Sequence, residues 1–269
     1  MPEFVIETLA DPRLDCYREL RQKTTQRQEI FVAEGEKLVR RLLASHCPTL
    51  SVVCTAEGRD LLADQIPDST PVFLTTASVI SQLVGFKFHR GLLAAGIPPA
   101  AETLESVLSQ RLEPHRGALV VVCPHISDPS NLGAIIRSAT AFGASAIVVG
   151  PAGTNPYSRR VLRTSMGAVL ELPLVETADW PAVQRTLQDF QFVSLAAVLE
   201  ESAQPVQQIT RPNRAALWLG NEDCGLDASL TALCQYRVKI PMANSQISLN
   251  VSVAAGVLLH HLARPSEPA

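Results

Sequence analysis

Three short segments of the chain combine glycines with polar side chains suited to binding a charged substrate. The first is Asp128–Gly143, which contains Asn131 and Arg137. The second is Leu217–Leu226, with Gly220, Glu222 and Gly225, and the third is Ile240–Leu259, with Ser248, Asn250 and Gly256. A guanidinium binds phosphate in a forked geometry, amides donate and accept hydrogen bonds, and a carboxylate accepts them. Taken singly, each segment is explained as well by helix capping or a glycine turn.

The segments follow apolar runs that predict strands of a buried parallel sheet. These β-branched runs cover residues 118–123, 146–149, 192–197, 215–219 and 236–240. Apolar positions at helical spacing predict helices over 131–143, 179–190 and 251–262. This alternation indicates an α/β domain whose ligands bind at the carboxyl ends of the strands, where the three segments lie. There, Gly220 would let a ligand approach the backbone and Gly225 would allow a tight turn.

A proline-containing stretch, Gly96-Ile-Pro-Pro-Ala-Ala-Glu102, predicts a linker between two domains. The N-terminal part, residues 1–97, mixes predicted strands at 50–54 and 71–74 with helices at 35–44 and 77–83. It reads as a small α/β domain. We assign residues 98–116 to the linker and a lead-in helix, 117–263 to the larger domain, and 264–269 to a tail.

The composition excludes several classes of protein. With 46% hydrophobic and 18% charged residues, the chain can bury a core and is not disordered. The net charge of −3 implies that any RNA contact depends on local patches. The six cysteines show no metal-ligand spacing, so we expect reduced, buried thiols and no metal site. No apolar run approaches the roughly 18 residues of a membrane helix, and the acidic N-terminus is unlike a signal peptide. A cytoplasmic protein without membrane partners is expected.

The ordered trio of segments resembles the SpoU (TrmH) family of RNA ribose 2′-O-methyltransferases in the SPOUT superfamily. The similarity covers residues 117–262, including Arg163-Thr-Ser-Met-Gly-Ala168, and extends more weakly to 30–39 and 90–95. The resemblance implies a C-terminal trefoil knot, S-adenosylmethionine as methyl donor, no metal, and a homodimer with its active site near the subunit interface. It also implies that the N-terminal domain binds the RNA substrate.

The family's functional positions can be carried over onto this sequence. The matching catalytic residues are Asn131, Arg137, Glu222, Ser248 and Asn250. The matching cofactor-binding residues are Leu219, Gly220, Ile240, Met242 and Leu249. In the family the arginine is proposed to assist deprotonation, but a guanidinium is a poor base, so a phosphate clamp is at least as plausible for Arg137. Glu222 would order its loop or Arg137. Asn244 departs from the glycine usual in the third segment.

Two basic stretches of the sequence offer candidate contacts to RNA. Eight basic and five acidic residues lie between Arg13 and Arg41, and a second basic stretch follows Tyr157. The candidate RNA contacts are Arg27, Lys37, Arg159, Arg160 and Arg163. Solvated helix faces would show the same pattern of basic residues.

We expect the substrate to be ribosomal RNA, with transfer RNA as the next candidate, and we expect no binding to DNA. A non-catalytic RNA-binding or ribosome-assembly protein on this fold is the alternative. Another nucleotide-binding α/β enzyme lacks support, because no phosphate-binding loop is present.

Overall fold

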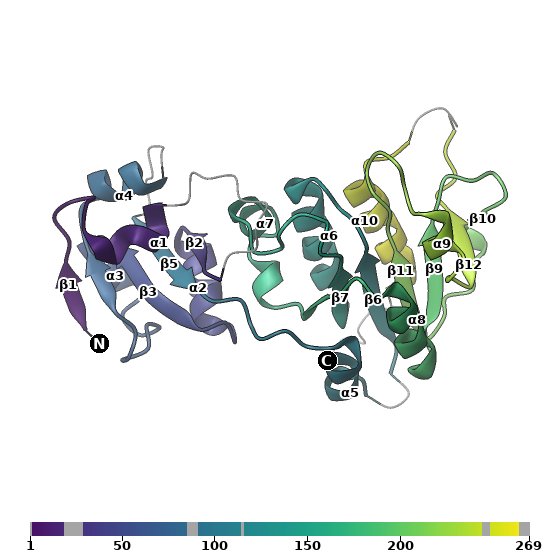
Figure 1. Cartoon of the computed structure of the whole chain (residues 1–269), viewed down its shortest axis with the longest axis horizontal. Helices are drawn as coiled ribbons and strands as arrows, with labels where there is room; N and C mark the ends of the chain where they lie inside the picture. Colours follow the sequence, from purple (N-terminus) through teal and green to yellow (C-terminus); the bar gives the residue numbers. More distant parts are fainter. Residues whose placement is uncertain (1, 19–28, 85–90, 114–115, 244–247, 264–269) are drawn as a thin grey trace. The chain divides into compact units, whose positions relative to one another are not determined.

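The computed structural model describes residues 2–18, 29–84, 91–113, 116–243 and 248–263 (Figure 1). Packing divides the chain into two compact units. The first contains Met1–Ala100 and Asn155–Glu171, and the second contains Ala101–Thr154 and Leu172–Ala269. Among the described residues, no helix has the length and apolar character needed to span a membrane.

The first unit is built on a mixed five-stranded sheet in the order β1-β4-β3-β5-β2. Strands β1 and β3 run parallel to β4, whereas β5 runs antiparallel to β3 and β2. The strands are β1 (Glu3–Val5), β2 (Phe31–Glu34), β3 (Thr49–Cys54), β4 (Val72–Leu74) and β5 (Leu92–Gly96). The helices of the N-terminal segment are α1 (Asp15–Arg18), α2 (Glu36–Ala44), α3 (Ala56–Leu61) and α4 (Ala77–Val84), after a short 3-10 turn, Pro12–Leu14.

Residues 155–171 lie within the segment 117–263 that the sequence predicts as one domain, yet they pack with the first unit. They form α7 (Arg159–Thr164) and a 3-10 turn, Ala168–Leu170. Tyr157 stacks on Phe31 with ring centroids 5.3 Å apart, and Arg159 forms an ion pair with the buried Glu34. Arg41 donates to the carbonyl of Met166. Apolar spacing predicts which residues are buried but does not say which unit buries them.

The second unit contains a seven-stranded sheet in the order β10-β12-β9-β11-β6-β7-β8, and every pairing in it is parallel. Its strands are β6 (Ala118–Cys123), β7 (Ala146–Val149), β8 (Leu174–Glu176), β9 (Val193–Ala197), β10 (Gln204–Pro205), β11 (Arg214–Trp218) and β12 (Tyr236–Lys239). Its helices are α5 (Leu104–Arg111), α6 (Pro129–Ala141), α8 (Trp180–Asp189), α9 (Ala228–Thr231) and α10 (Val251–Leu262), with a 3-10 turn at Val206–Gln208. The predicted parallel α/β fold is confirmed, and the predicted strand and helix ends differ by at most two residues.

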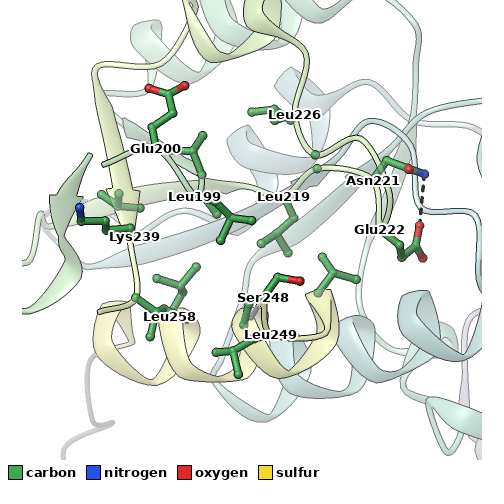
Figure 2. A pocket seen from close by; sticks show the side chains of 18 of the residues that line it. Leu199, Glu200, Leu219, Asn221, Glu222, Leu226, Lys239, Ser248, Leu249 and Leu258 are labelled. Carbon is green, nitrogen blue, oxygen red and sulfur yellow. Dashed lines mark hydrogen bonds between the residues drawn. The ribbon is translucent and has the colours of Figure 1, made fainter. Parts of the chain in front are cut away.

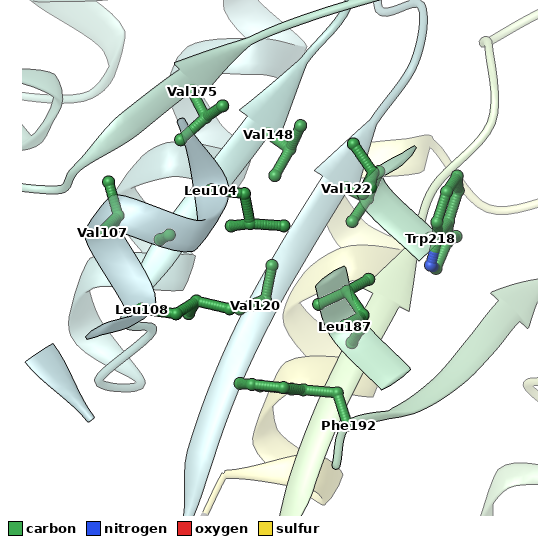
Figure 3. Close-up of a cluster of buried hydrophobic side chains, with 13 residues drawn as sticks. Leu104, Val107, Leu108, Val120, Val122, Val148, Val175, Leu187, Phe192 and Trp218 are labelled. Atoms are coloured by element: carbon green, nitrogen blue, oxygen red, sulfur yellow. The ribbon is translucent and has the colours of Figure 1, made fainter. Parts of the chain in front are cut away.

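Helices cover both faces of this sheet, as a fully buried parallel sheet requires. On one face, α5 and α8 bury Val107, Leu108 and Leu187 against Val120, Val122 and Trp218 of the strands (Figure 3). On the other side, α6 packs against α10, and α10 also contacts β11. Because the polar side chains of the first and third segments lie at the starts of α6 and α10, this packing brings those two segments together.

Candidate active site

A pocket lies at the carboxyl ends of β9, β11 and β12 (Figure 2). It encloses about 390 Å³ and is walled by the segments that follow these strands and by α10. The five predicted cofactor-binding residues all line it: Leu219, Gly220, Ile240, Met242 and Leu249. Of the predicted catalytic residues, Glu222 and Ser248 line it as well. Segments two and three therefore share one cavity, which no local sequence feature could establish.

Glu222 is the centre of a polar network beside this pocket. One carboxylate oxygen accepts hydrogen bonds from the backbone N–H and hydroxyl of Ser127, at 3.1 and 2.8 Å, and from Asn221 Nδ2 at 3.2 Å. The other accepts from Asp128 N and Asn131 Nδ2, both at 3.0 Å. Partial burial alone would raise the pKa of Glu222, but the hydrogen bonds from Asn131, Ser127 and Asp128 outweigh it and lower the pKa to about 2. Glu222 is thus a carboxylate at neutral pH.

Asn131 carries the network on to the third segment. Its Oδ1 accepts from Asn250 Nδ2 at 2.9 Å, while Asn250 Oδ1 accepts from the backbone N–H and the hydroxyl of Ser252. Asn250 therefore also caps α10, as helix-capping chemistry predicts. Asn131 does not cap α6, because Asp128 does so with bonds to Ser130 N and Asn131 N. The prediction that Asn131 caps α6 is wrong. Its side chain instead bonds Glu222 in the loop after β11 and Asn250 in the loop before α10.

Arg137 stands apart from this network. Its side chain is exposed on α6 and does not line the pocket. Within the part of the chain that the structure describes, no hydrogen bond or ion pair engages it. Of the two roles expected for Glu222, the bonds to Ser127 and Asp128 support ordering of the loop rather than of Arg137. An exposed guanidinium without a partner is available to a phosphate.

The glycines of the second segment shape its loop. Gly225 has φ +72°, the left-handed conformation expected of a tight turn. A Cβ on Gly220 would lie 2.2 Å from Gly225 C and Leu226 N. Glycine is therefore required at position 220 because the loop folds back onto it. Gly220 also lines the pocket, so the approach of a ligand to its backbone stays a prediction. A pairing of Asn221 with Gly225 closes the turn.

The predicted RNA contacts fall mostly on the first unit. Arg160 and Arg163 are exposed on α7, and Lys37 is exposed on α2. Arg159 instead pairs with Glu34 and donates to the carbonyl of Val84, so its guanidinium is engaged in holding α7. Arg27 and Asn244 lie outside the described residues.

Two residues that contact Glu222 directly, Ser127 and Asn221, were not among the predicted site residues. The signal in the sequence was that they lie next to predicted site residues or in the same segment.

The cysteines are free, but the expectation that they are buried holds for only some of them. Cys47, Cys54 and Cys123 are buried, whereas Cys224 is exposed in the pocket wall. Cys224 lies within the turn between Asn221 and Gly225 rather than in an apolar run, which explains its exposure.

Comparison with known proteins places this arrangement. Residues 118–260 match the SpoU rRNA Methylase family. The chain is 32% identical over 264 residues to an uncharacterized tRNA/rRNA methyltransferase of Mycobacterium tuberculosis, covering 94% of this chain and 89% of that protein. It is 30% identical over 240 residues to the 23S rRNA (guanosine-2′-O-)-methyltransferase RlmB of Acinetobacter baylyi, covering 86% and 95% of the two chains.

A solved structure agrees with these relatives. The AdoMet-bound rRNA methyltransferase of Sinorhizobium meliloti superposes with a TM-score of 0.83 at 25% identity, and the match covers 97% of each chain. The similarity thus extends over both compact units. This chain belongs to the SpoU rRNA methylase family.

Proposed function

We propose that this protein transfers a methyl group from S-adenosylmethionine to a ribose 2′-hydroxyl of ribosomal RNA in the cytoplasm, with transfer RNA as the next candidate substrate. Family membership and the named activity of the relatives support an RNA 2′-O-methyltransferase. The observation that carries the proposal is the joining of all three polar segments beside one pocket, through the bonds of Glu222 to Asn131 and of Asn131 to Asn250.

The pocket fits the methyl donor. Its volume lies in the range of small-molecule sites, and Leu219, Leu226, Leu249 and Leu258 give it apolar walls suited to an adenine. Charged side chains, including Glu200, Lys239 and Glu222, lie among its lining residues. The backbone at Leu219, Ile240 and Leu249 would hold the adenosine part. When bound, S-adenosylmethionine supplies an electrophilic methyl group on a sulfonium.

The chain's own residues would orient the acceptor. The ribose oxygen forms the new O–C bond as the S–C bond breaks, so sulfur leaves as a neutral thioether and the hydroxyl proton passes to solvent. Alignment of the two reactants in such a displacement can lower the barrier by about 7–11 kcal/mol. We assign Asn250 and Ser248 to positioning the ribose and Arg137 to clamping an adjacent phosphate, which also stabilises the developing negative charge.

We further propose that the protein acts as a homodimer and is knotted at its C-terminal end, as the family resemblance implies. Val253 and Val257 are spaced by four residues and lie exposed on one side of α10, with Val253 52% exposed, and the exposed Leu249 lies just before the helix. A second copy would bury these side chains beside the pocket. Val253→Arg should convert the dimer to a monomer in light scattering; an unchanged mass would refute this interface.

The first unit is proposed to bind the RNA, with Lys37, Arg160 and Arg163 as phosphate contacts. These cations are exposed, and the near-neutral whole chain makes such local patches the available electrostatic contacts. Residues 1–97 would form this substrate-binding domain together with the packed segment 155–171.

The decisive experiment is methyl transfer from radiolabelled S-adenosylmethionine to ribosomal and transfer RNA. Methylation would then be mapped in RNA from cells with and without the protein. Incorporation into ribosomal RNA at one ribose, absent from the deletion strain, is expected. Tight RNA binding without incorporation into any RNA would instead identify a non-catalytic RNA-binding protein.

A further inference from the structure

The hydrogen bonds around Glu222 fix which end of each neighbouring side-chain amide donates and which accepts. A carboxylate only accepts hydrogen bonds, so Asn131 must turn its Nδ2 toward Glu222 and its Oδ1 toward Asn250. Asn250 must then turn its Nδ2 toward Asn131 and its Oδ1 toward Ser252. The two ends of an amide are hard to distinguish in isolation, but here the donors and acceptors along the chain allow one assignment.

These amide orientations determine which hydrogen-bonding group of Asn250 is available to a substrate. Its Oδ1 already accepts two hydrogen bonds, from Ser252 N at 2.9 Å and Ser252 Oγ at 2.6 Å. One hydrogen of its Nδ2 is given to Asn131. Because the residue is exposed, its second N–H is the polar group left to face the RNA. Asn250 is therefore a donor, matched to an acceptor oxygen of a ribose.

Two residues hold the carboxylate that sets these orientations. Ser127 donates to Glu222 twice, and Asn221 Nδ2 donates both to Glu222 and, at 3.3 Å, to Ser127 Oγ. Asn221 Oδ1 accepts from the N–H groups of Asp223 and Cys224, so its amide is also fixed in one orientation. Three donors thus converge on one oxygen of Glu222 and leave the other turned to Asn131.

We propose that Ser127 and Asn221 are positioning residues for the methyl transfer: they lock Glu222 so that Asn131 presents Asn250 to the ribose as a hydrogen-bond donor. This inference rests on the proposed function. In this proposal Asn131 acts through its hydrogen bond with Asn250.

The first test compares Ser127→Ala, Asn221→Ala and the double variant in steady-state methyl transfer. Each single change should lower kcat about five-fold, which is the effect expected from the loss of one hydrogen bond. The double variant should lose less than the product of the two single losses, because both act on one carboxylate. In Ser127→Ala the KM for S-adenosylmethionine should stay within two-fold, because Ser127 does not line the pocket. Ser109→Ala, the same change at an exposed position of α5, is the matched control and should leave kcat unchanged. Unaltered kcat in both single variants would overturn the proposal.

The second test reverses the polarity of the network. Glu222→Gln should turn Asn131 around and lower kcat at least ten-fold. Glu222→Gln combined with Asn131→Asp restores an acceptor for Asn250 and should regain at least ten-fold over Glu222→Gln alone. A role limited to stability predicts no such regain, so its absence would refute the relay. Side-chain amide resonances of Asn250 should move in Glu222→Gln and return in the double variant, a readout that does not need activity. An inactive wild type would instead defeat the proposed function.

Discussion

Asn131 donates a 3.0 Å hydrogen bond to Glu222 across 91 positions of sequence, and so ties the start of α6 to the loop after β11. Glu222 holds the loop before α6 through Ser127 and Asp128 as well. The parallel sheet brings the start of α6 and the loop after β11 to the same edge. The Glu222 carboxylate then fixes the position of these two segments relative to each other. The placement of the Asn131 and Asn250 side chains beside the pocket depends on this connection.

Gly220→Ala should disrupt the pocket. Its Cβ would lie 2.2 Å from the backbone of Gly225 and Leu226, so the loop must move. We expect a loss of roughly 1–3 kcal/mol in the free energy of unfolding, from overpacking, and at least ten-fold weaker binding of S-adenosylmethionine by calorimetry. Gly256→Ala on α10 is the control, because its Cβ meets no atom of the described residues within 4 Å. It should keep affinity and gain up to about 1 kcal/mol of stability. Equal affinities in the two variants would contradict the packing argument.

The stability of the second unit should depend on the charge of Glu222. Its pKa falls from 4.5 to about 2 on folding, so its contribution is full above pH 4.5 and is lost as the pH falls toward 2. Urea unfolding of wild type and Glu222→Gln at pH values from 6 to 2 would measure this contribution as the difference between the two proteins. The difference should shrink over that interval. A constant difference would show that Glu222 does not gain its hydrogen bonds on folding.

Arg137→Lys separates charge from geometry at the proposed phosphate clamp. Lysine keeps the positive charge but loses the planar fork that binds two phosphate oxygens. Because Arg137 is exposed, the melting temperature should not change. We expect kcat to fall about ten-fold or more, with RNA affinity retained. Near-wild-type turnover at unchanged RNA affinity would rule out bidentate clamping.

Charge reversal on α7 tests the RNA-binding surface. Arg160→Glu and Arg163→Glu should each weaken RNA binding. The slope of log affinity against log salt concentration should also become shallower, by roughly 0.7–0.9 for each phosphate that the protein no longer neutralises. Titration of RNA at several salt concentrations gives both quantities. Arg185→Glu, an equivalent change at an exposed position of α8, should alter neither. If the three variants bind alike at every salt concentration, α7 is a solvated helix face.

The strands, helices and family could be predicted because they depend on local pattern. Apolar runs mark β6 and β7 to the residue, since a strand buried on both faces excludes polar side chains. Strands β8 and β10 have only three and two residues, too few for a pattern to stand out. The order of the three polar segments was enough to indicate the methyltransferase family, although capping and turn formation explain each segment alone.

The tertiary structure decided the partners of each side chain. Glu222 bonds Ser127, Asp128 and Asn131 rather than Arg137, and Asp128 rather than Asn131 caps α6. The packing of residues 155–171 on the first unit was equally hidden. Periodicity reports whether a residue is buried, and residue type reports what it can donate or accept. Neither says which distant group completes a hydrogen bond, because that depends on where the folded sheet places each loop.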